Sequence, residues 1–206
     1  MLYETVLDEV ALSLLKEYCS LPFLKNFSLA GGTGLALRLG HRLSYVIDLF
    51  SYEKFDVNQL DTELESYYGY SYLKKGTLSN ALFSNVHSVK SDFIYDYTKK
   101  IKEVEKIDFI RIYPLEENIA MKMNAICGRG RKRDFYDLYF ILKHFSFNEV
   151  CNFFSEKYGN EKLILFFKSV VYFDDAEKDE EPVLLKEKIT WKQVKRSILK
   201  NVNIKL

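Results

Sequence analysis

The first third of the chain switches between helical and extended hydrophobic patterns. Apolar residues recur every three to four positions between Glu4 and Tyr18, which predicts a packing helix. A short apolar run at Phe27–Ala30 predicts a strand that leads into a glycine turn. The elements expected next are a short helix at Thr33–Leu39 ending near Gly40, a buried strand at Tyr45–Phe50, and a helix from an N-cap at Asp56 to about Tyr68.

The middle of the chain has a different texture, because Tyr, Phe, Val, Ser and Thr dominate from Tyr70 to Tyr97. Turn signals at Lys75–Gly76 and Ser84–Asn85 divide this segment. We therefore expect two or three antiparallel strands, the last of them over Val86–Tyr95. Residues Phe109–Tyr113 predict one more short strand.

The remainder of the chain has a helical pattern. Pro114 precedes a predicted helix at Leu115–Cys127, which has an acidic first turn and ends at Gly128–Arg129–Gly130. The acidic run Asp174–Glu181 predicts a solvated loop. We expect further helices at Lys132–Phe145, Phe147–Tyr158, Glu161–Val171 and Trp191–Lys200, the last with Thr190 as its N-cap.

This order of elements predicts an α+β fold, in which a mixed sheet with helices is followed by a C-terminal helical bundle. The change of pattern divides the chain into an α/β domain over residues 1–112 and a helical domain over residues 113–206. We expect the second domain to contribute residues to the active site of the first.

The composition of the chain is sufficient for a hydrophobic core, and its cysteines and apolar runs indicate the cellular compartment. The 206 residues are 48% hydrophobic and carry a net charge of only +1, so global charge gives no argument for nucleic-acid binding. Three cysteines without C-x-x-C spacing predict reduced thiols, and three scattered histidines do not suggest a zinc site. No signal pattern is present and no apolar run approaches the ~20 residues of a membrane span, so we expect a cytoplasmic protein without a membrane partner.

The candidate chemistry begins at the glycine turn. Gly31 and Gly32 lie between a predicted strand and a predicted helix, where backbone N–H groups and the helix dipole favour a phosphate. Asp48 follows on an apolar strand, where an isolated carboxylate is costly unless it is paired or binds a metal. A phosphate cradle followed by a carboxylate is what phosphoryl transfer on a nucleotide requires.

A second block supports this interpretation. It runs from Met121 through Lys122 to the sequence Arg133-Asp134-Phe135-Tyr136-Asp137-Leu138. Together with Gly31–Leu37, Gly40–Arg42 and Ser44–Phe50, it resembles the AbiEii/AbiGii-type nucleotidyltransferase toxin family, the toxin half of type IV toxin–antitoxin and abortive-infection systems. The resemblance implies a nucleotidyltransferase fold.

One position departs from the family pattern. The strand motif of the family reads S-x-D-x-D, and the matching positions here are Ser44, Val46 and Asp48. Alternation would put two such aspartates on one face of the strand to hold divalent metal, and a valine cannot do so. Three explanations are open: an engineered inactivating substitution, a naturally degenerate enzyme, or a site that works with other ligands. We favour an inactivated form of a real enzyme.

The resemblance also assigns roles to the other residues. Gly31, Gly32, Thr33, Arg42, Ser44 and Lys122 are expected to bind nucleotide, although a lysine like Lys122 can also simply reach solvent. Asp48 and Asp92 are expected to bind metal, with Asp108 as the alternative to Asp92. Asp134 and Asp137 share a helix face, so one can orient the site and the other act as general base; a purely structural Arg–Asp network is the alternative.

The implied reaction is transfer of a nucleoside monophosphate from a nucleoside triphosphate to an acceptor, with Mg²⁺ (or Mn²⁺) as cofactor. The family makes tRNA the expected acceptor and a cognate antitoxin protein the expected partner. The basic cluster at Arg129–Arg133 is the candidate contact to RNA phosphates, against a solvated helix start. The alternative functions are a non-catalytic nucleotide- or RNA-binding module and a protein-modifying nucleotidyltransferase.

Overall fold

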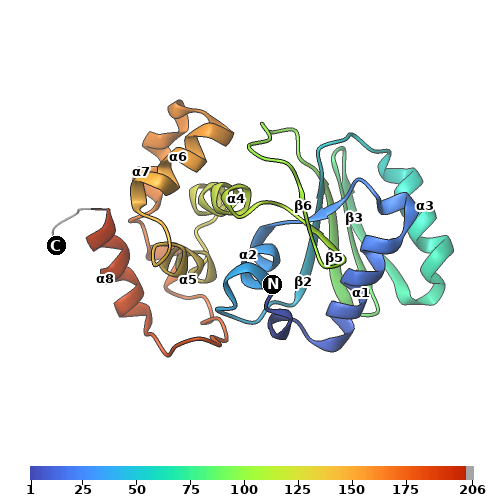
Figure 1. The fold of residues 1–206 in the computed structure, drawn as a ribbon, viewed down its shortest axis with the longest axis horizontal. Helices are drawn as coiled ribbons and strands as arrows, with labels where there is room; N and C mark the ends of the chain where they lie inside the picture. Colours follow the sequence, from blue (N-terminus) through green and yellow to red (C-terminus); the bar gives the residue numbers. More distant parts are fainter. Residues whose placement is uncertain (203–206) are drawn as a thin grey trace.

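A computed structural model describes residues 1–202, and its centre is a seven-stranded mixed sheet (Figure 1). The strand order is β3-β4-β5-β2-β1-β7-β6. β2 runs parallel to β5 and β1 runs parallel to β7, whereas the other neighbours are antiparallel. The strands are β1 (Ser28–Leu29), β2 (Val46–Ser51), β3 (Tyr72–Leu78), β4 (Ala81–Val86), β5 (Val89–Tyr95), β6 (Glu105–Ile107) and β7 (Ile110–Ile112).

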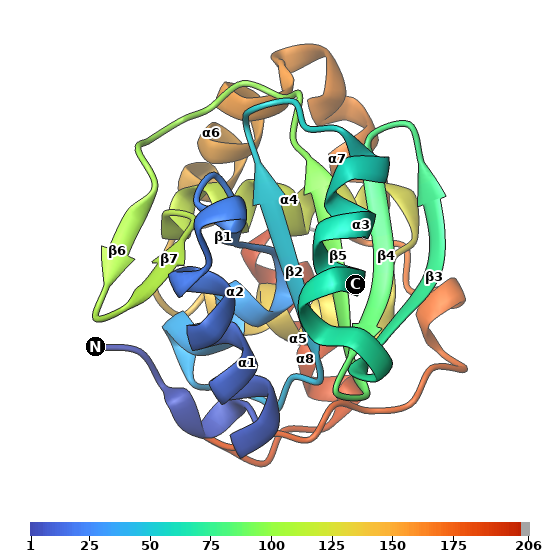
Figure 2. The same ribbon diagram turned by 90° about the vertical axis from the view of Figure 1, so that its right-hand side faces the viewer.

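Helices cover both faces of the sheet. α1 (Glu9–Ser20) and α3 (Val57–Tyr68) lie on one face, as Figure 2 shows, and their apolar sides form a first core with the sheet. Residue alternation along β2 directs Ile47 and Leu49 into this core, so that Val46 and Asp48 face the opposite side. α2 (Gly31–Leu39) and α4 (Leu115–Gly128) pack together on that opposite side.

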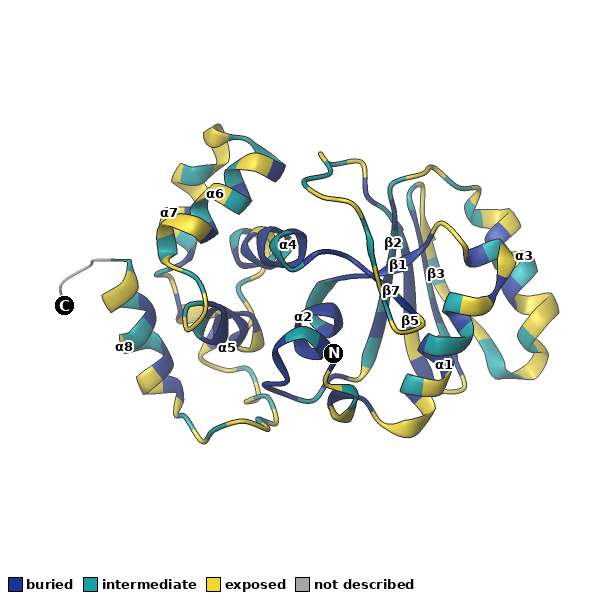
Figure 3. Cartoon of the chain, viewed as in Figure 1, coloured by how far each residue is buried: buried dark blue, intermediate teal, exposed yellow. Residues whose placement is uncertain are grey.

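A second core lies among the C-terminal helices α5 (Lys132–Ile141), α6 (Phe147–Tyr158), α7 (Leu163–Ser169) and α8 (Trp191–Asn201). It is rich in aromatic rings, including Phe135, Phe154 and Trp191. α2 belongs to both cores, because its Ala36 and Leu37 face the first and its Leu35 and Leu39 face the second. Figure 3 shows α2, α4 and α5 as the deeply buried helices, with exposed residues on the outer helices. The glycine turn at the start of α2 is therefore held between the two cores.

A buried ion cluster also joins the sheet to the helices. The ammonium of Lys157 in α6 lies 2.7 Å from Glu117 Oε2 in α4 and 3.2 Å from Asp96 Oδ2, which follows β5. It also donates to the Tyr52 hydroxyl at 3.1 Å. The three charged side chains are buried, so each needs the others to offset the loss of water.

The predicted α+β fold class is confirmed, and most of the predicted elements are present. Asp56 and Thr190 accept the predicted N-cap hydrogen bonds, and Gly40 ends α2 in the left-handed conformation, with φ +63°. The division into domains at residue 112 stays a prediction, although the two cores separate near that point except at α2.

Several details of the predicted elements were wrong. The turns of the β3–β4–β5 meander lie at Ser79–Asn80 and at His87–Ser88, not at Lys75–Gly76, which is an irregularity within β3, or at Ser84–Asn85, which lies inside β4. β6 was missed. The predicted N-terminal helix is broken at its start, with a 3-10 turn over Glu4–Val6 before α1, and α5 and α7 are shorter than predicted.

Candidate functional site

The glycine turn packs directly on the candidate metal ligand. Gly31 has φ +67°, and a Cβ added to it would lie 3.1 Å from Asp48 Oδ2. A Cβ on Gly32 would lie 2.9 Å from Arg42 Nη2 and 3.7 Å from Lys122 Nζ. Both positions thus exclude larger residues, the first by backbone conformation and the second by contact. The turn brings the first N–H groups of α2 close to the Asp48 carboxylate and the Lys122 ammonium.

The hydroxyls of Thr33 and Ser44 connect α2 to β2. They lie 2.7 Å apart, and Thr33 Oγ1 donates to the carbonyl of Val46 at 2.5 Å. Both side chains are buried. The sequence suggested them as phosphate ligands, but the structure commits them to each other and to the backbone beside Asp48.

Asp48 and Asp92 are direct partners in the register of the parallel strands β2 and β5. Their side chains share one face, because strands that pair in register keep the same alternation. Asp108, the alternative third carboxylate, instead lies in the exposed β6–β7 turn at the far edge of the sheet, with φ +53°. The geometry therefore brings Asp92, and not Asp108, to Asp48.

The two carboxylates differ in their surroundings. Burial, followed by the charge of Asp92, raises the pKa of Asp48 above its ordinary value. Asp92 Oδ2 lies 2.9 Å from the ammonium of Lys90, while Asp92 Oδ1 is buried and, within residues 1–202, accepts no hydrogen bond. A buried carboxylate oxygen without a donor is unusual and marks a position at which a cation or a proton would be stabilised.

Asp137 is the centre of a buried hydrogen-bond network under the turn. Its two oxygens accept from Arg42 Nε at 2.6 Å and Arg42 Nη2 at 3.0 Å, and His41 Nε2 lies 2.7 Å from the first. Arg42 also donates to the carbonyl of Gly32 at 3.2 Å. Arg42 was predicted to bind nucleotide, but its guanidinium is directed at Asp137 and at the backbone of the glycine turn.

Lys122 lies between the two aspartates of the second block. Its Nζ is 2.6 Å from Asp134 Oδ1 and 2.8 Å from Asp137 Oδ2. Asp134 also accepts from the backbone N–H of Arg131 at 3.2 Å, in a capping box at the start of α5. Lys122 has three N–H donors, so one remains for a further acceptor on the side of Gly32.

The charges of this network set its protonation. Burial acts to raise the pKa of Asp137, but Arg42 and Lys122 outweigh it and hold that pKa well below its usual range. Burial lowers the pKa of His41, although Asp137 opposes this. Within the described residues Nδ1 of His41 has no hydrogen-bond partner, as expected for a neutral ring that donates through Nε2.

The basic cluster is only partly available to a ligand. Arg131 Nη1 lies 2.8 Å from Asp179 Oδ1, and the ammonium of Lys132 donates to the carbonyl of Glu177. The predicted solvated acidic loop thus packs onto the start of α5. Arg129 and Arg133 remain exposed, and the Arg129 charge acts on Asp48.

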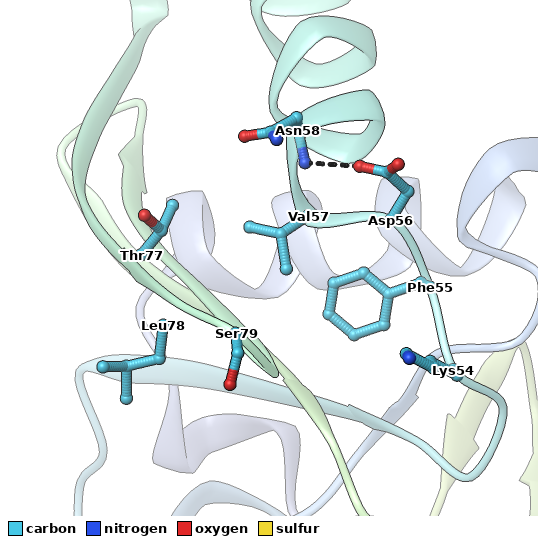
Figure 4. A pocket seen from close by; sticks show the side chains of 8 residues that line it. All are labelled: Lys54, Phe55, Asp56, Val57, Asn58, Thr77, Leu78 and Ser79. Carbon is cyan, nitrogen blue, oxygen red and sulfur yellow. Dashed lines mark hydrogen bonds between the residues drawn. The ribbon is translucent and has the colours of Figure 1, made fainter.

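A surface pocket lies away from these residues. It has a volume of about 530 Å³ and is formed by residues 54–58 and 77–79, at the start of α3 and the β3–β4 turn (Figure 4). Its one carboxylate, Asp56, already caps α3 by accepting from the N–H of Asn58. This pocket contains none of the residues of the site, so we assign it no chemistry.

Comparisons with known proteins identify the family of this chain. Residues 88–203 match the family described as nucleotidyl transferase AbiEii toxin, type IV TA system. The chain belongs to the AbiEii family. An uncharacterised protein of Aquifex aeolicus is 34% identical over 173 residues, which cover 80% of this chain and 82% of that protein.

Solved structures show that the nucleotidyltransferase fold extends over nearly the whole chain. A protein of Helicobacter pylori described as a nucleotidyltransferase has 19% identity to this chain and a TM-score of 0.56, and the match covers 98% of this chain and 92% of the other. The nucleotidyltransferase toxin MenT4 of Mycobacterium tuberculosis has 15% identity to this chain and a TM-score of 0.62. That match covers 93% of this chain and 83% of MenT4. In this AbiEii protein, none of the helices within residues 1–202 is long and apolar enough to cross a membrane.

Proposed function

We propose that this site transfers a nucleoside monophosphate from a nucleoside triphosphate to an acceptor hydroxyl, with release of pyrophosphate. The observation that carries the proposal is the pairing of Asp48 with Asp92 directly against the glycine turn of α2. Phosphoryl transfer needs such a combination, because positive groups must hold the triphosphate while carboxylates manage metal and proton.

The phosphates are bound by the start of α2 and by Lys122. Within residues 1–202, Ala30 at the N-cap provides no side-chain acceptor for the first N–H groups of the helix. Those N–H groups and the helix dipole attract an anion. The ammonium of Lys122 borders the same region, since its Nζ lies 3.7 Å from a Cβ built on Gly32.

The residues fit one divalent ion better than two. Asp48 and Oδ1 of Asp92 would hold one Mg²⁺ or Mn²⁺ ion with two protein carboxylates. Residues 1–202 contain no larger group, of three or more Asp, Glu, His or Cys, that could hold a metal ion. When bound, the ion would neutralise charge on the phosphates. Val46 removes the ligand that a second ion would need.

Asp134 and Asp137 act as positioning residues in this proposal. Asp137 is already contacted by Arg42, Lys122 and the neutral His41, and its lowered pKa makes it a poor base. Asp134 is held by Lys122 and by the start of α5. Neither of these two aspartates is therefore assigned the role of general base.

The acceptor is RNA in this proposal, with tRNA as the class that the family suggests. Arg129 and Arg133 are exposed beside the site and supply cations for a phosphate backbone, although the whole chain carries a net charge of only +1. A protein antitoxin is the partner implied by the type IV family, and the cytoplasm is the compartment in which nucleotide and RNA are both available.

A labelling assay tests the proposal. The chain, its Val46→Asp form and its Asp48→Asn form are incubated with a total tRNA pool, Mg²⁺ and each nucleoside triphosphate, labelled at the α- or the γ-phosphate. We expect label on RNA from the α-phosphate only, more of it with Val46→Asp and none with Asp48→Asn. Label on protein instead would identify a protein hydroxyl as the acceptor.

A non-catalytic binding module is the second candidate, and Val46 is the observation that favours it. In that case the triphosphate binds, yet neither the chain nor Val46→Asp transfers label to RNA or protein.

The labelling assay also needs a matched control for the loss of a single carboxylate in Asp48→Asn. Asp174→Asn provides it, because Asp174 is an exposed acidic residue outside the site.

A further inference from the structure

Lys90 lies directly across from Val46, the position at which the family pattern has an aspartate. In the parallel register of β2 and β5, Val46 pairs with Lys90 and Asp48 pairs with Asp92. The four side chains therefore form a square on one face of the sheet. The Lys90 ammonium reaches along β5 to Asp92 Oδ2 at 2.9 Å.

Within residues 1–202, Asp92 is the one charged partner of Lys90. Its side chain is 54% exposed, while that of Asp92 is 7% exposed, so the ammonium lies where the buried carboxylate meets solvent. An ammonium carries three N–H donors, so an exposed ion pair with one carboxylate leaves Lys90 able to contact an anion that approaches the glycine turn.

Val46, where the family pattern has an aspartate, and Lys90 both make the site less negative. A third carboxylate would demand divalent cations to offset its repulsion. Here two carboxylates and one ammonium leave a single negative charge, and the Lys90 charge already acts to lower the pKa of Asp48.

We propose that Lys90 is a built-in cation of the nucleotide site, which takes the place of a divalent ion when a nucleoside triphosphate binds. The inference rests on the proposed function, because it names a residue of the same site. It makes binding of the triphosphate largely independent of metal, even if transfer requires one.

An ordinary surface ion pair is the competing interpretation. A partly exposed Lys–Asp pair contributes about 0–1 kcal/mol to stability and binds no ligand. Stability alone therefore cannot separate the two interpretations, whereas ligand affinity in the absence of metal can.

Isothermal titration calorimetry with each of the four nucleoside triphosphates provides the test, in Mg²⁺ and in EDTA. The variants are Lys90→Met, Lys90→Arg and, as a matched control, Lys106→Met, an exposed lysine in β6 at the far edge of the sheet. Thermal melting of each variant confirms that it folds.

We expect the unchanged chain to bind in EDTA within about tenfold of its affinity in Mg²⁺. Lys90→Met should weaken metal-free binding about tenfold or more, while Lys90→Arg and Lys106→Met retain it. In Val46→Asp combined with Lys90→Met, binding should become dependent on Mg²⁺.

Two results would overturn the inference, and they are distinguishable. If the chain binds triphosphate in Mg²⁺ but not in EDTA, or if Lys90→Met binds as well as the unchanged chain in EDTA, the role of Lys90 is wrong and the proposed function stands. If no triphosphate binds in either buffer, the nucleotide site itself is wrong, and the role of Lys90 with it.

Discussion

The guanidinium of Arg42 binds both carboxylate oxygens of Asp137, at 2.6 and 3.0 Å, in a fully buried position. Arg42 continues to the carbonyl of Gly32, so the pair connects α5 to the glycine turn. Residues almost one hundred positions apart in the chain thus fix the conformation of the phosphate-binding segment.

Removing the charge of Asp137 should unfold much of this arrangement. Asp137→Asn leaves Arg42 and Lys122 with an uncharged partner in the interior, so we expect the free energy of unfolding to fall by about 3–5 kcal/mol. Urea denaturation followed by circular dichroism measures the change. Asp174→Asn on the surface should stay within about 0.5 kcal/mol, and an equally small effect for Asp137→Asn would show that the network is not structural.

Stability should also depend on pH through His41. Burial lowers the pKa of this ring below its ordinary 6.5, so the unfolded chain binds a proton at a higher pH than the folded chain does. The stabilisation is complete above pH 6.5 and is lost as the pH falls below it, with a slope approaching about 1.4 kcal/mol per pH unit.

The test of the His41 effect compares the unchanged chain with His41→Gln between pH 5 and 8. The glutamine amide can still donate to Asp137 but does not titrate, so the difference in melting temperature between the two should narrow on acidification. Parallel curves at all pH values would contradict a neutral, buried His41. Asp48, whose raised pKa acts in the opposite direction, contributes equally to both proteins and cancels in the comparison.

We expect Asp48 to lower the free energy of unfolding while being required for nucleotidyl transfer. Its pKa is raised by burial and by Asp92, so the folded state disfavours the ionised form at every pH above the ordinary value of 3.8. Asp48→Asn should therefore raise the free energy of unfolding at pH 7 by about 1 kcal/mol while abolishing nucleotidyl transfer. Denaturation and the labelling assay are run on the same preparation, and a loss of both stability and transfer would show that the carboxylate is mainly structural.

The glycine turn offers a prediction with an internal control. Gly31→Ala forces a side chain into positive φ and against Asp48 Oδ2, so we expect a loss of about 1–2 kcal/mol and weaker binding of the triphosphate. Gly128→Ala, at the end of α4 with open space around it, should instead be neutral or stabilising by up to about 1 kcal/mol. Equal behaviour of the two variants would remove the argument that Gly31 shapes the site.

Local signals in the sequence predicted most elements because caps and periodicity are local properties. Asp56, Thr190 and Gly40 show this, since each acts within one turn of its own helix. The turn at His87–Ser88 was not predicted. Both residues adopt positive φ, and a sequence indicates such a turn only when Asn or Gly occupies these positions.

The site could be predicted only as a set of residues, not as a set of contacts. The sequence proposed Asp48 and the Asp134–Asp137 pair, and it named Asp92 with Asp108 as the alternative because strand register is a tertiary property. It gave no signal for the position of Lys90 beside Val46, which depends on the pairing of β2 with β5. Likewise, Arg42 and Thr33 were interpreted as ligand contacts because a sequence does not reveal that their donors are already used.

The decisive experiment is a crystal structure of the chain with a non-hydrolysable nucleoside triphosphate and Mg²⁺. We expect the triphosphate to lie at the start of α2, within hydrogen-bond distance of the N–H groups of Gly31–Thr33 and of the ammonium groups of Lys90 and Lys122. A triphosphate bound in the pocket beside Thr77–Ser79, or one that leaves Asp48 and Asp92 without contact, would contradict it.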